Sequence, residues 1–209
     1  MAAFISWSGT ATLNRKTLRT QAGLNKCGDA TMDTSFKSDM LKQFSHYFKQ
    51  LEVPAKTMLL QEGQISRTMY FIEKGCLRTW VNNDGKDITT QFFFEGDAVS
   101  SIESFRTNQP SLYSIESLEP CVLQTLSAKD FQEILDASPE FRKSMEDRMF
   151  KRFYQAQQIF YSYLKNTPQK RYEELLQQYP HIVQRVPQHY IASYLGITSV
   201  SLSRIRNRR

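Results

Sequence analysis

The sequence predicts an α+β protein, in which a domain of short antiparallel strands is followed by a long helix and then by a helix-turn-helix. Three observations indicate this class. Between residues 57 and 126, β-rich runs alternate with turn signals. Residues 139–166 carry an apolar side chain every three or four positions. The last two dozen residues show the ordered pattern of a tight bihelical turn.

The bulk composition excludes several classes of protein. At 209 residues the chain is long enough for one large domain or two modest ones. No apolar run reaches the length that spans a bilayer, so we expect no membrane partner. The three cysteines, Cys27, Cys76 and Cys121, are far apart, which argues against a disulfide framework and favours a cytoplasmic location. No Cys or His pair has metal-ligand spacing, and we expect no metal site.

The positive charge is concentrated at the two ends of the chain. The net charge is +6, and residues 181–209 hold five arginines and no acidic residue. A basic end on a balanced body is typical of a protein that binds a polyanion. A solvated tail that binds nothing would have the same charge. The order of the residues therefore has to distinguish a polyanion-binding segment from such a tail.

Residues 1–32 show no sustained apolar period and have the composition of a disordered extension. Residues 1–31 are basic, with Asp29 as the single acid, and also resemble a transit peptide. A further interpretation is that translation begins at Met32 and the preceding residues are misannotated. We favour this last interpretation because no downstream feature requires the segment.

Residues 33–138 form the predicted β domain. An apolar spacing over 35–51 predicts an amphipathic helix, which Pro54 ends. Strands are predicted over Met69–Ile72, Cys76–Val81 and Ile88–Phe94. Asp84-Gly85 lies between two of these runs and predicts a tight hairpin, because that turn needs positive φ. A helical region is expected to begin at Ser127.

Residues 139–166 are predicted to form one long helix, with Pro139 in its first turn. Its apolar stripe is longer than the β domain is expected to cover. Two interpretations follow: the stripe packs on its own chain, or it joins two chains. We favour a homodimer, because twofold assemblies are common. The residues assigned to the dimer interface are apolar and lie on this stripe: Phe141, Met145, Met149, Phe153 and Phe160.

Residues 167–209 are predicted to form the helix-turn-helix domain. Thr167-Pro168 begins a helix that Pro180 ends. Pro187 is suited to open the first helix of the motif, and Gly196 to end it in the left-handed conformation. Thr198 then caps the second helix, which is the one that enters the major groove in such motifs.

The outward residues of this motif are those that DNA contacts require. Arg204 is suited to a bidentate contact with guanine, worth ~1–3 kcal/mol of discrimination. The remaining candidates are small, polar or basic side chains, most of them suited to phosphate contacts: Gln188, His189, Ser199, Val200, Ser201, Ser203, Arg206 and Arg208. The alternative is an ordinary helical hairpin with solvated arginines, which the full ordered pattern makes less favoured.

From about residue 35 to its end, the chain resembles the CRP/FNR family of bacterial transcription regulators. Three phrases of the β domain carry the resemblance: Leu60–Gln64, Met69–Arg78 and Phe94–Asp97. The segment Ile197–Arg206 looks most like the Bacteroidetes branch of the family. The resemblance implies a cyclic-nucleotide-binding-like jelly roll (a double-stranded β-helix), a long dimerisation helix and a C-terminal domain of the winged-helix type.

The resemblance also implies where an effector would bind. The residues that correspond to this pocket follow the Gly-Asp phrase: Gly96, Asp97, Ser101, Ile102, Ser111, Leu112 and Tyr113. In members that bind cyclic AMP, a glutamate grips the ribose and an arginine followed by a hydroxyl residue grips the phosphate. Those three positions fall on Ser101, Ser111 and Leu112, so both charged groups are missing. A buried phosphate needs a charged partner. We therefore expect no cyclic AMP binding and predict no cofactor, while another effector stays open.

The chain leaves little room for a wing after the recognition helix. It stops at Arg209, so any wing strands would have to precede the motif, around Ile182-Val183. Two interpretations stay open: this branch lacks the downstream part, or the sequence is truncated.

The function predicted from the sequence is that of a homodimeric regulator that binds double-stranded DNA, with RNA polymerase as a further candidate partner. The alternative is an effector-binding or protein-interaction module whose helix-turn-helix no longer reads DNA. An enzyme is not expected, since no Ser/His/Asp or Cys/His arrangement and no phosphate-binding glycine loop is visible.

Overall fold

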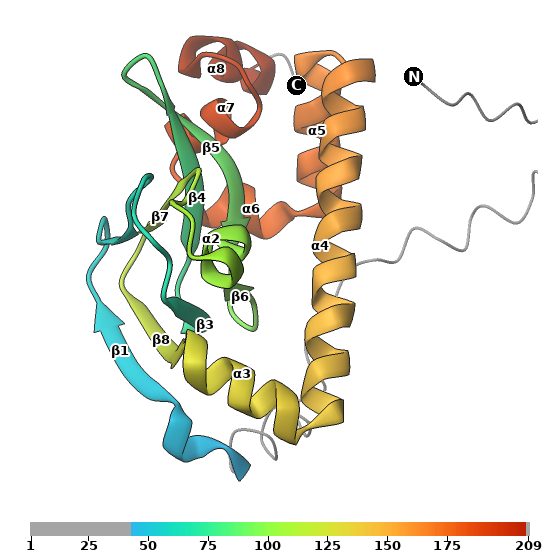
Figure 1. Ribbon diagram of the computed structural model, residues 1–209. Coiled ribbons are helices and arrows are strands. Elements are labelled where there is room, and N and C mark those ends of the chain that lie inside the picture. Colours follow the sequence, from blue (N-terminus) through green and yellow to red (C-terminus); the bar gives the residue numbers. More distant parts are fainter. Residues whose placement is uncertain (1–42, 208–209) are drawn as a thin grey trace, which may run out of the picture. The chain divides into compact units, whose positions relative to one another are not determined.

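A computed structural model describes residues 43–207 (Figure 1). The eight strands are β1 (Lys49–Val53), β2 (Met58–Leu60), β3 (Thr68–Lys74), β4 (Leu77–Asn83), β5 (Lys86–Phe93), β6 (Ala98–Val99), β7 (Ser114–Ser117) and β8 (Cys121–Ser127). The helical elements are η3 (Ser45–Tyr47), α2 (Ile102–Thr107), α3 (Ala128–Ala137), α4 (Pro139–Lys165), α5 (Pro168–Gln178), α6 (Pro180–Arg185), α7 (Gln188–Tyr194) and α8 (Ser199–Asn207).

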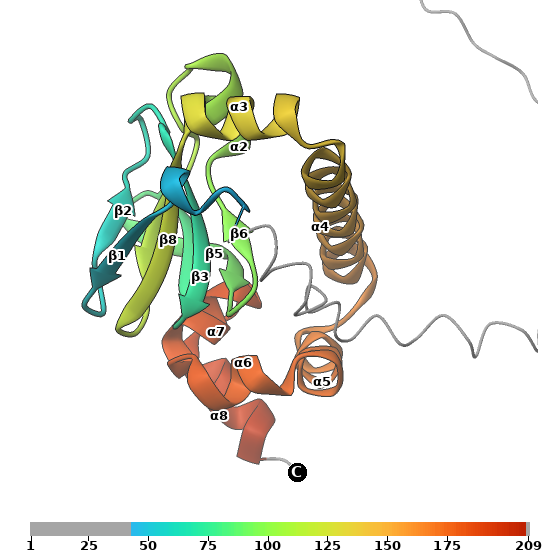
Figure 2. The ribbon, with the colours of Figure 1, turned by 90° about the horizontal axis from the view of Figure 1, so that it is seen from below.

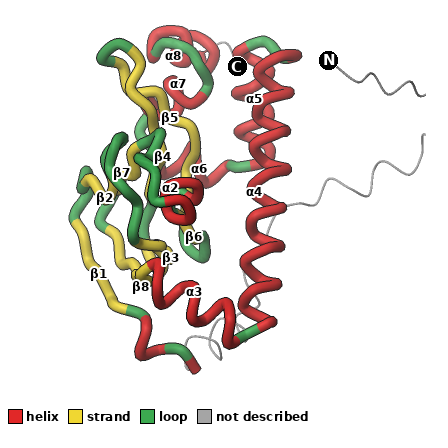
Figure 3. The backbone as a smooth tube through the Cα atoms, viewed as in Figure 1, coloured by secondary structure: helices red, strands yellow, loops and turns green. Residues whose placement is uncertain are grey.

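The strands form two four-stranded antiparallel sheets that face each other (Figure 3). One sheet has the order β1-β8-β3-β6 and the other the order β2-β7-β4-β5. Alternate side chains of each strand point inward, so the core between the sheets takes residues from strands of both. Its fully buried members include Leu77, Ile115 and Leu123.

The predicted strands and hairpin are observed. The three strands predicted from the sequence are observed as β3, β4 and β5, with ends shifted by one or two residues. Asp84 and Gly85 join β4 to β5 with φ values of +51° and +79°. Two successive positive φ values are those of the hairpin turn that matches the twist of the flanking strands. The Asp-Gly pair therefore sets the register of this hairpin.

The helix predicted over residues 35–51 is wrong from residue 44 onward, since residue 43 is α-helical and the residues after it are not. Residues 45–47 form one 3-10 turn, and Lys49–Val53 is β1, which pairs with β8 from Lys49↔Thr125 to Val53↔Cys121. Residues 35–42 lie outside the described residues. The apolar spacing fitted a helix, but pairing with a strand some 70 residues away decided the outcome.

A second core joins the sheets to the two helices that follow β8. The hydroxyl of Ser127 accepts from the Asp130 N–H and starts α3, as predicted. The Ser138 hydroxyl accepts from the Phe141 N–H and starts α4, with Pro139 in its first turn. Figure 2 shows α3 crossing from the sheets to the start of α4. Ile134 and Phe141 are buried where these helices meet.

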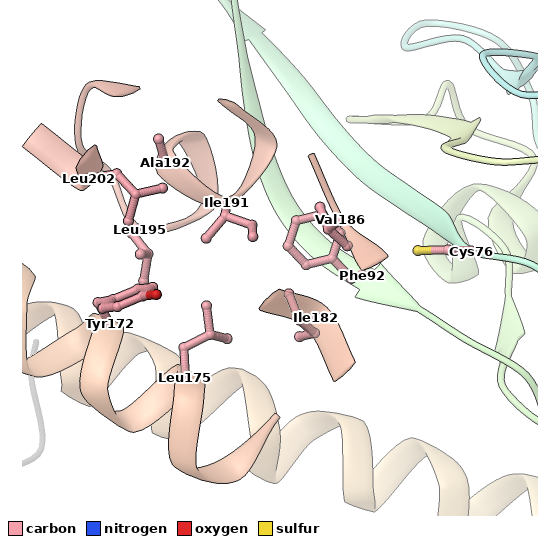
Figure 4. Close-up of a cluster of buried hydrophobic side chains, with 10 residues drawn as sticks. All are labelled: Cys76, Phe92, Tyr172, Leu175, Ile182, Val186, Ile191, Ala192, Leu195 and Leu202. Atoms are coloured by element: carbon pink, nitrogen blue, oxygen red, sulfur yellow. The ribbon is translucent and has the colours of Figure 1, made fainter. Parts of the chain in front are cut away.

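Helices α5 to α8, which we call the helical head, share a third core. Its buried members are Tyr172, Leu175, Ile182, Val186, Ile191, Ala192, Leu195 and Leu202. Cys76, just before β4, and Phe92 on β5 belong to the same cluster, and Figure 4 shows Phe92 beside Val186. The wing strands predicted around Ile182-Val183 are not observed, because these residues form α6 after Pro180 and bury Ile182 on a helical face.

Candidate nucleic-acid interface and effector region

Helices α7 and α8 are joined by a tight turn. Gly196 ends α7 with φ +66°, a conformation that costs glycine little. The Thr198 hydroxyl accepts from the Ser201 N–H at 3.1 Å and caps α8, as the sequence predicted. Ala192 and Leu202, from the two helices, are 1 % exposed, so the helices pack closely. This is the bihelical geometry in which the second helix enters a major groove.

The outward face of α8 carries most of the predicted DNA-contact residues. Its exposed side chains are Ser199, Val200, Ser203, Arg204, Arg206 and Asn207. Ser201 is half-buried, and its hydroxyl lies 3.0 Å from that of Thr198, so part of its hydrogen-bonding capacity serves the cap. Gln188 and His189 are exposed at the start of α7. Arg208 lies outside the described residues.

The first helix of the motif packs on the β domain through a serine. The Ser193 hydroxyl donates to the Asp87 carbonyl at 2.7 Å and accepts from the Thr89 N–H at 2.9 Å. These two bonds attach α7 to β5. Phe92 and Tyr194 add a ring contact with centroids 5.2 Å apart. The helical head is thereby fixed to the edge strand of one sheet.

A buried arginine connects the sheet to the same helix. Arg78 on β4 is 2 % exposed, and its guanidinium lies 2.7 Å from the Glu116 carboxylate and 3.1 Å from that of Asp87. The guanidinium also lies 4.1 Å from the ring centroid of Tyr190 on α7. Planar stacking combined with paired carboxylates is chemistry that arginine provides and lysine does not.

Two carboxylates of the β domain bind the segment that precedes the helix-turn-helix. Arg185, at the end of α6, donates to Glu95 at 2.7 and 2.8 Å and also to Glu119. The hydrogen bonds from Arg185 lower the pKa of Glu95 to about 2, and the Gly75 N–H adds to this effect. The carboxylate is therefore charged at neutral pH and remains paired.

The residues assigned to the dimer interface divide into two groups. Phe141 and Met145 are 0 % and 7 % exposed in the core beside α3, so they are unavailable to a second chain, and their assignment was wrong. Met149, Phe153 and Phe160 are exposed by 49 %, 57 % and 59 %. More exposed aromatic and apolar residues extend this stripe along α4: Phe150, Tyr154, Tyr161 and Leu164.

The predicted effector residues differ in how far they are exposed. Ser101 and Ser111 are each 2 % exposed. The Ser111 hydroxyl donates to the Tyr113 carbonyl at 2.7 Å, and the Tyr113 hydroxyl donates to the Ser100 carbonyl at 3.0 Å. Burial raises the pKa of Tyr113, so its hydroxyl stays protonated. Ile102 and Leu112 are exposed, by 37 % and 69 %.

Gly96 and Asp97 contact α4 instead. Arg148 donates to the Gly96 carbonyl at 2.9 Å, and Arg152 lies 2.9 Å from the Asp97 carboxylate. Arg152 also stacks on Phe93, 4.3 Å from the ring centroid. Burial lowers the pKa of Arg148. The Gly-Asp phrase thus connects the β domain to the long helix.

Sequence reasoning missed several residues that connect parts of this chain, among them Arg78, Arg148 and Ser193. One signal was available for Arg78, which is a charged residue inside an otherwise buried β-rich run. Nothing local marks Arg148 or Ser193, because their partners are 52 and 106 residues away. A cavity of about 420 Å³ between α4, α5 and α7 was also not foreseen; Gln158, Arg171 and Tyr194 are among its lining residues.

Two observations concern metal sites and membrane spans. Among residues 43–207, the His, Cys, Asp and Glu side chains form no group of three or more that would hold a metal ion. In the same residues, no helix combines the length and the apolar character that crossing a bilayer requires.

Comparison with known proteins agrees with this architecture. Residues 50–138 match the family of the cyclic nucleotide-binding domain. The cAMP-activated global transcriptional regulator CRP of Salmonella typhimurium is 22 % identical over 100 residues, which are 47 % of this chain and 48 % of that protein. The chain thus matches about half the length of this relative.

Solved structures extend the likeness to most of the chain. A CooA mutant from Carboxydothermus hydrogenoformans has a TM-score of 0.70 at 18 % identity, covering 87 % of this chain and 84 % of CooA. A protein described as a transcriptional regulator of the CRP/FNR family from Eubacterium rectale has a TM-score of 0.63 at 18 % identity, with 82 % of each chain covered. The predicted α+β fold, a β-roll followed by a helical domain, is therefore confirmed.

Proposed function

We propose that this chain, which is of the CRP/FNR type by its fold and its cyclic nucleotide-binding domain, is a homodimeric transcription regulator that binds double-stranded DNA. The observation that carries the proposal is α8. It is capped by Thr198, buried on the side of Leu202, and exposes Arg204 and Arg206 on its outer side. A helix held in this way presents basic and polar groups to a groove.

The exposed stripe of α4 supports the homodimer. Seven aromatic or large apolar residues of one helix are between 47 % and 67 % exposed. Exposed apolar patches of this kind mark interaction sites on soluble proteins. A second copy supplies the same stripe, as twofold symmetry requires. Two recognition helices would then reach successive major grooves about 34 Å apart.

DNA binding is tested by selecting bound sequences from a random duplex library and measuring affinity against salt. We expect Arg204→Ala to relax sequence preference at one position, at a cost of ~1–3 kcal/mol on the selected site. Arg206→Ala should weaken all duplexes about equally and reduce the salt slope by about one. Lys143→Ala, which removes an exposed positive charge from α4, is the matched control and should leave both quantities unchanged.

Failure of the wild-type chain to bind any duplex at low salt would contradict the proposal. It would favour the alternative, a module whose helix-turn-helix no longer reads DNA. Equal behaviour of Arg204→Ala, Arg206→Ala and Lys143→Ala would lead to the same conclusion, since neither arginine would then be at the interface.

We further propose that cyclic AMP is not the effector. The positions that correspond to its charged contacts hold Ser101 and Ser111, both buried, and the Ser111 hydroxyl is bonded to a neighbouring backbone carbonyl. Arg106, in the last turn of α2, is exposed and is not at the phosphate-binding position. A cyclic phosphate placed here would lose its hydration without gaining a charged partner.

Isothermal titration of the full chain with cyclic AMP checks this. We expect no heat of binding at micromolar concentrations. Micromolar binding that is abolished by Ser101→Ala or Ser111→Ala would overturn the proposal. Binding that persists unchanged in both variants would equally contradict it and place the ligand at another site.

A further inference from the structure

Val200 is an apolar side chain on an otherwise polar helix face. It is 61 % exposed, while the residues around it on the outer side of α8 are Ser199, Ser203 and Arg204. A single exposed valine is ordinary on a protein surface. Val200, however, lies on the proposed recognition helix, where an exposed apolar side chain would meet the edges of DNA bases.

Helical geometry places Val200 at the centre of the outer face. At 3.6 residues per turn, Val200 lies about 160° around the helix from the buried Leu202, and Arg204 lies at about the same angle on the other side. Arg206 lies only about 40° from Leu202, on the flank. The flank faces the phosphate backbone, and the centre faces the base edges. Val200 and Arg204 therefore both point to the floor of the groove.

The position along the helix agrees with this geometry. α8 begins at Ser199, so Val200 is the second residue of this helix. Recognition helices contact base edges with their N-terminal residues. The Thr198 cap fixes the first turn, so the Val200 side chain has a defined direction.

We propose that Val200 reads a thymine through its 5-methyl group. In the major groove, the edges of guanine, cytosine and adenine present hydrogen-bond donors and acceptors, whereas thymine also presents a methyl group. Valine has no hydrogen-bonding atom in its side chain, so its favourable contact is with that methyl group. A cytosine at the same place would present its N4–H₂ donor to an apolar group and lose a water contact.

Arg204 fixes where this thymine lies relative to the guanine. Four residues along a helix span about 6 Å, which is close to two base-pair steps of 3.4 Å along a strand. The half-site is therefore expected to hold a T·A pair about two base pairs from the G·C pair that Arg204 contacts. This inference rests on the proposed DNA binding.

The test replaces thymine by deoxyuridine in the selected site, which removes only the 5-methyl group. Wild-type affinity should fall about fourfold at the one thymine that Val200 contacts, from the free energy of a buried methyl group. Val200→Ser should bind the thymine and deoxyuridine duplexes equally. Val200→Thr, which keeps one methyl group, should recover part of the difference.

Arg206→Ala is the matched control. It should bind both duplexes more weakly while keeping the fourfold ratio, since a phosphate contact does not detect a base methyl group. Circular dichroism of the Val200 variants checks that α8 remains folded.

The outcomes separate the two proposals. If the wild-type chain binds no duplex, the proposed function fails and this inference fails with it. If the chain binds its selected site but deoxyuridine changes affinity at no thymine, DNA binding stands and the thymine contact is wrong. A deoxyuridine penalty of equal size in wild type and Val200→Ser also overturns the contact.

Discussion

Gly75 shows how closely one residue of the β domain is packed. A Cβ added there would lie 2.5 Å from the Cys121 Sγ and 2.9 Å from the Pro120 carbonyl oxygen, and its φ is +108°. Gly63 has a similar φ of +86°, but a Cβ added to it would meet no atom of the described residues within 4 Å. Comparing Gly75 with Gly63 therefore distinguishes the free-energy cost of a positive φ from the cost of steric crowding.

Gly75→Ala should destabilise the protein more than Gly63→Ala does. Both variants lose ~1–2 kcal/mol by placing an L residue in the left-handed region. Gly75→Ala should lose a further ~1–3 kcal/mol from overpacking against Cys121. Urea denaturation of both variants measures the difference, and equal losses would show that the strand end moves freely.

The ion pair of Glu95 and Arg185 predicts a pH dependence. The folded pKa of Glu95, about 2, lies below its ordinary value of 4.5 because Arg185 donates to the carboxylate. The pair therefore contributes stability above pH 4.5, and that contribution is lost as the pH falls from about 4.5 towards 2. At neutral pH the contribution is constant.

Arg185→Ala should flatten the acid limb of the stability curve. The urea midpoint of the wild type should fall more steeply between about pH 5 and pH 3 than that of the variant. Arg142→Ala is the control, because its pair with Asp136 is more exposed and is expected to matter little. Parallel curves for wild type and Arg185→Ala would contradict the assigned role.

At the scale of the element, α4 presents two different surfaces. One carries Arg148 and Arg152 towards the Gly96-Asp97 turn. The other is the exposed stripe that includes Phe153 and Phe160. The helix is therefore suited to contact its own β domain and a second chain at the same time.

Charged substitutions on the stripe should separate the proposed dimer. Phe153→Glu and Phe160→Glu would bring like charges together across the twofold axis and remove buried apolar area, so we expect a monomer by sedimentation equilibrium. Gln158→Glu, on the face that lines the cavity beside α5, is the control and should remain dimeric. A Phe153→Glu protein with wild-type mass would place the interface elsewhere.

The sequence predicted best those elements whose signals are local. The Asp84-Gly85 turn, the starts of α3, α4 and α5 and the Thr198 cap of α8 rest on a few adjacent residues, and all are observed. Elements decided by distant partners were missed. β1 pairs with β8, and its apolar spacing was mistaken for a helix. Wing strands were placed around Ile182-Val183 only because few residues follow the recognition helix, whereas burial of Ile182 with Val186 one turn later favours α6.

The candidate site was predictable to a similar extent. The exposed side chains of α8 follow from helical period and from the buried Leu202. The attachment of α7 to β5 does not follow, because Ser193 and Asp87 are separated by 106 residues. The burial of Phe141 and Met145 could not be predicted without knowing where α3 packs, because α3 covers only the first turns of the apolar stripe of α4.

At the scale of the whole molecule, β5 serves two cores. Phe92 points to the helical head and Phe93 to the interior between the sheets, and each is 6 % exposed. Neighbouring side chains of a strand point to opposite faces, so one strand supports both. The helical head and the β domain are therefore expected to unfold together.

Phe92→Ala should uncouple them. The variant loses ~3–5 kcal/mol of core packing, mostly from the helical head. Calorimetry of the wild type should give one transition, and Phe92→Ala should give two, with the new one at lower temperature. Phe93→Ala is the comparison, since it weakens the interior between the sheets and should lower the β-domain transition. A single transition in Phe92→Ala would contradict the shared core.

The side chains of β5 point alternately to the two cores, and this has a consequence for genetic screens. Ile115 shares the sandwich interior with Phe93 of β5, so we expect a substitution that repacks this interior to shift β5 and the attached helix α7. A screen for altered promoter output should therefore recover interior positions far from any duplex, without a change in ligand. Suppressors of such alleles should appear on the opposite face of the same strand, at every second residue.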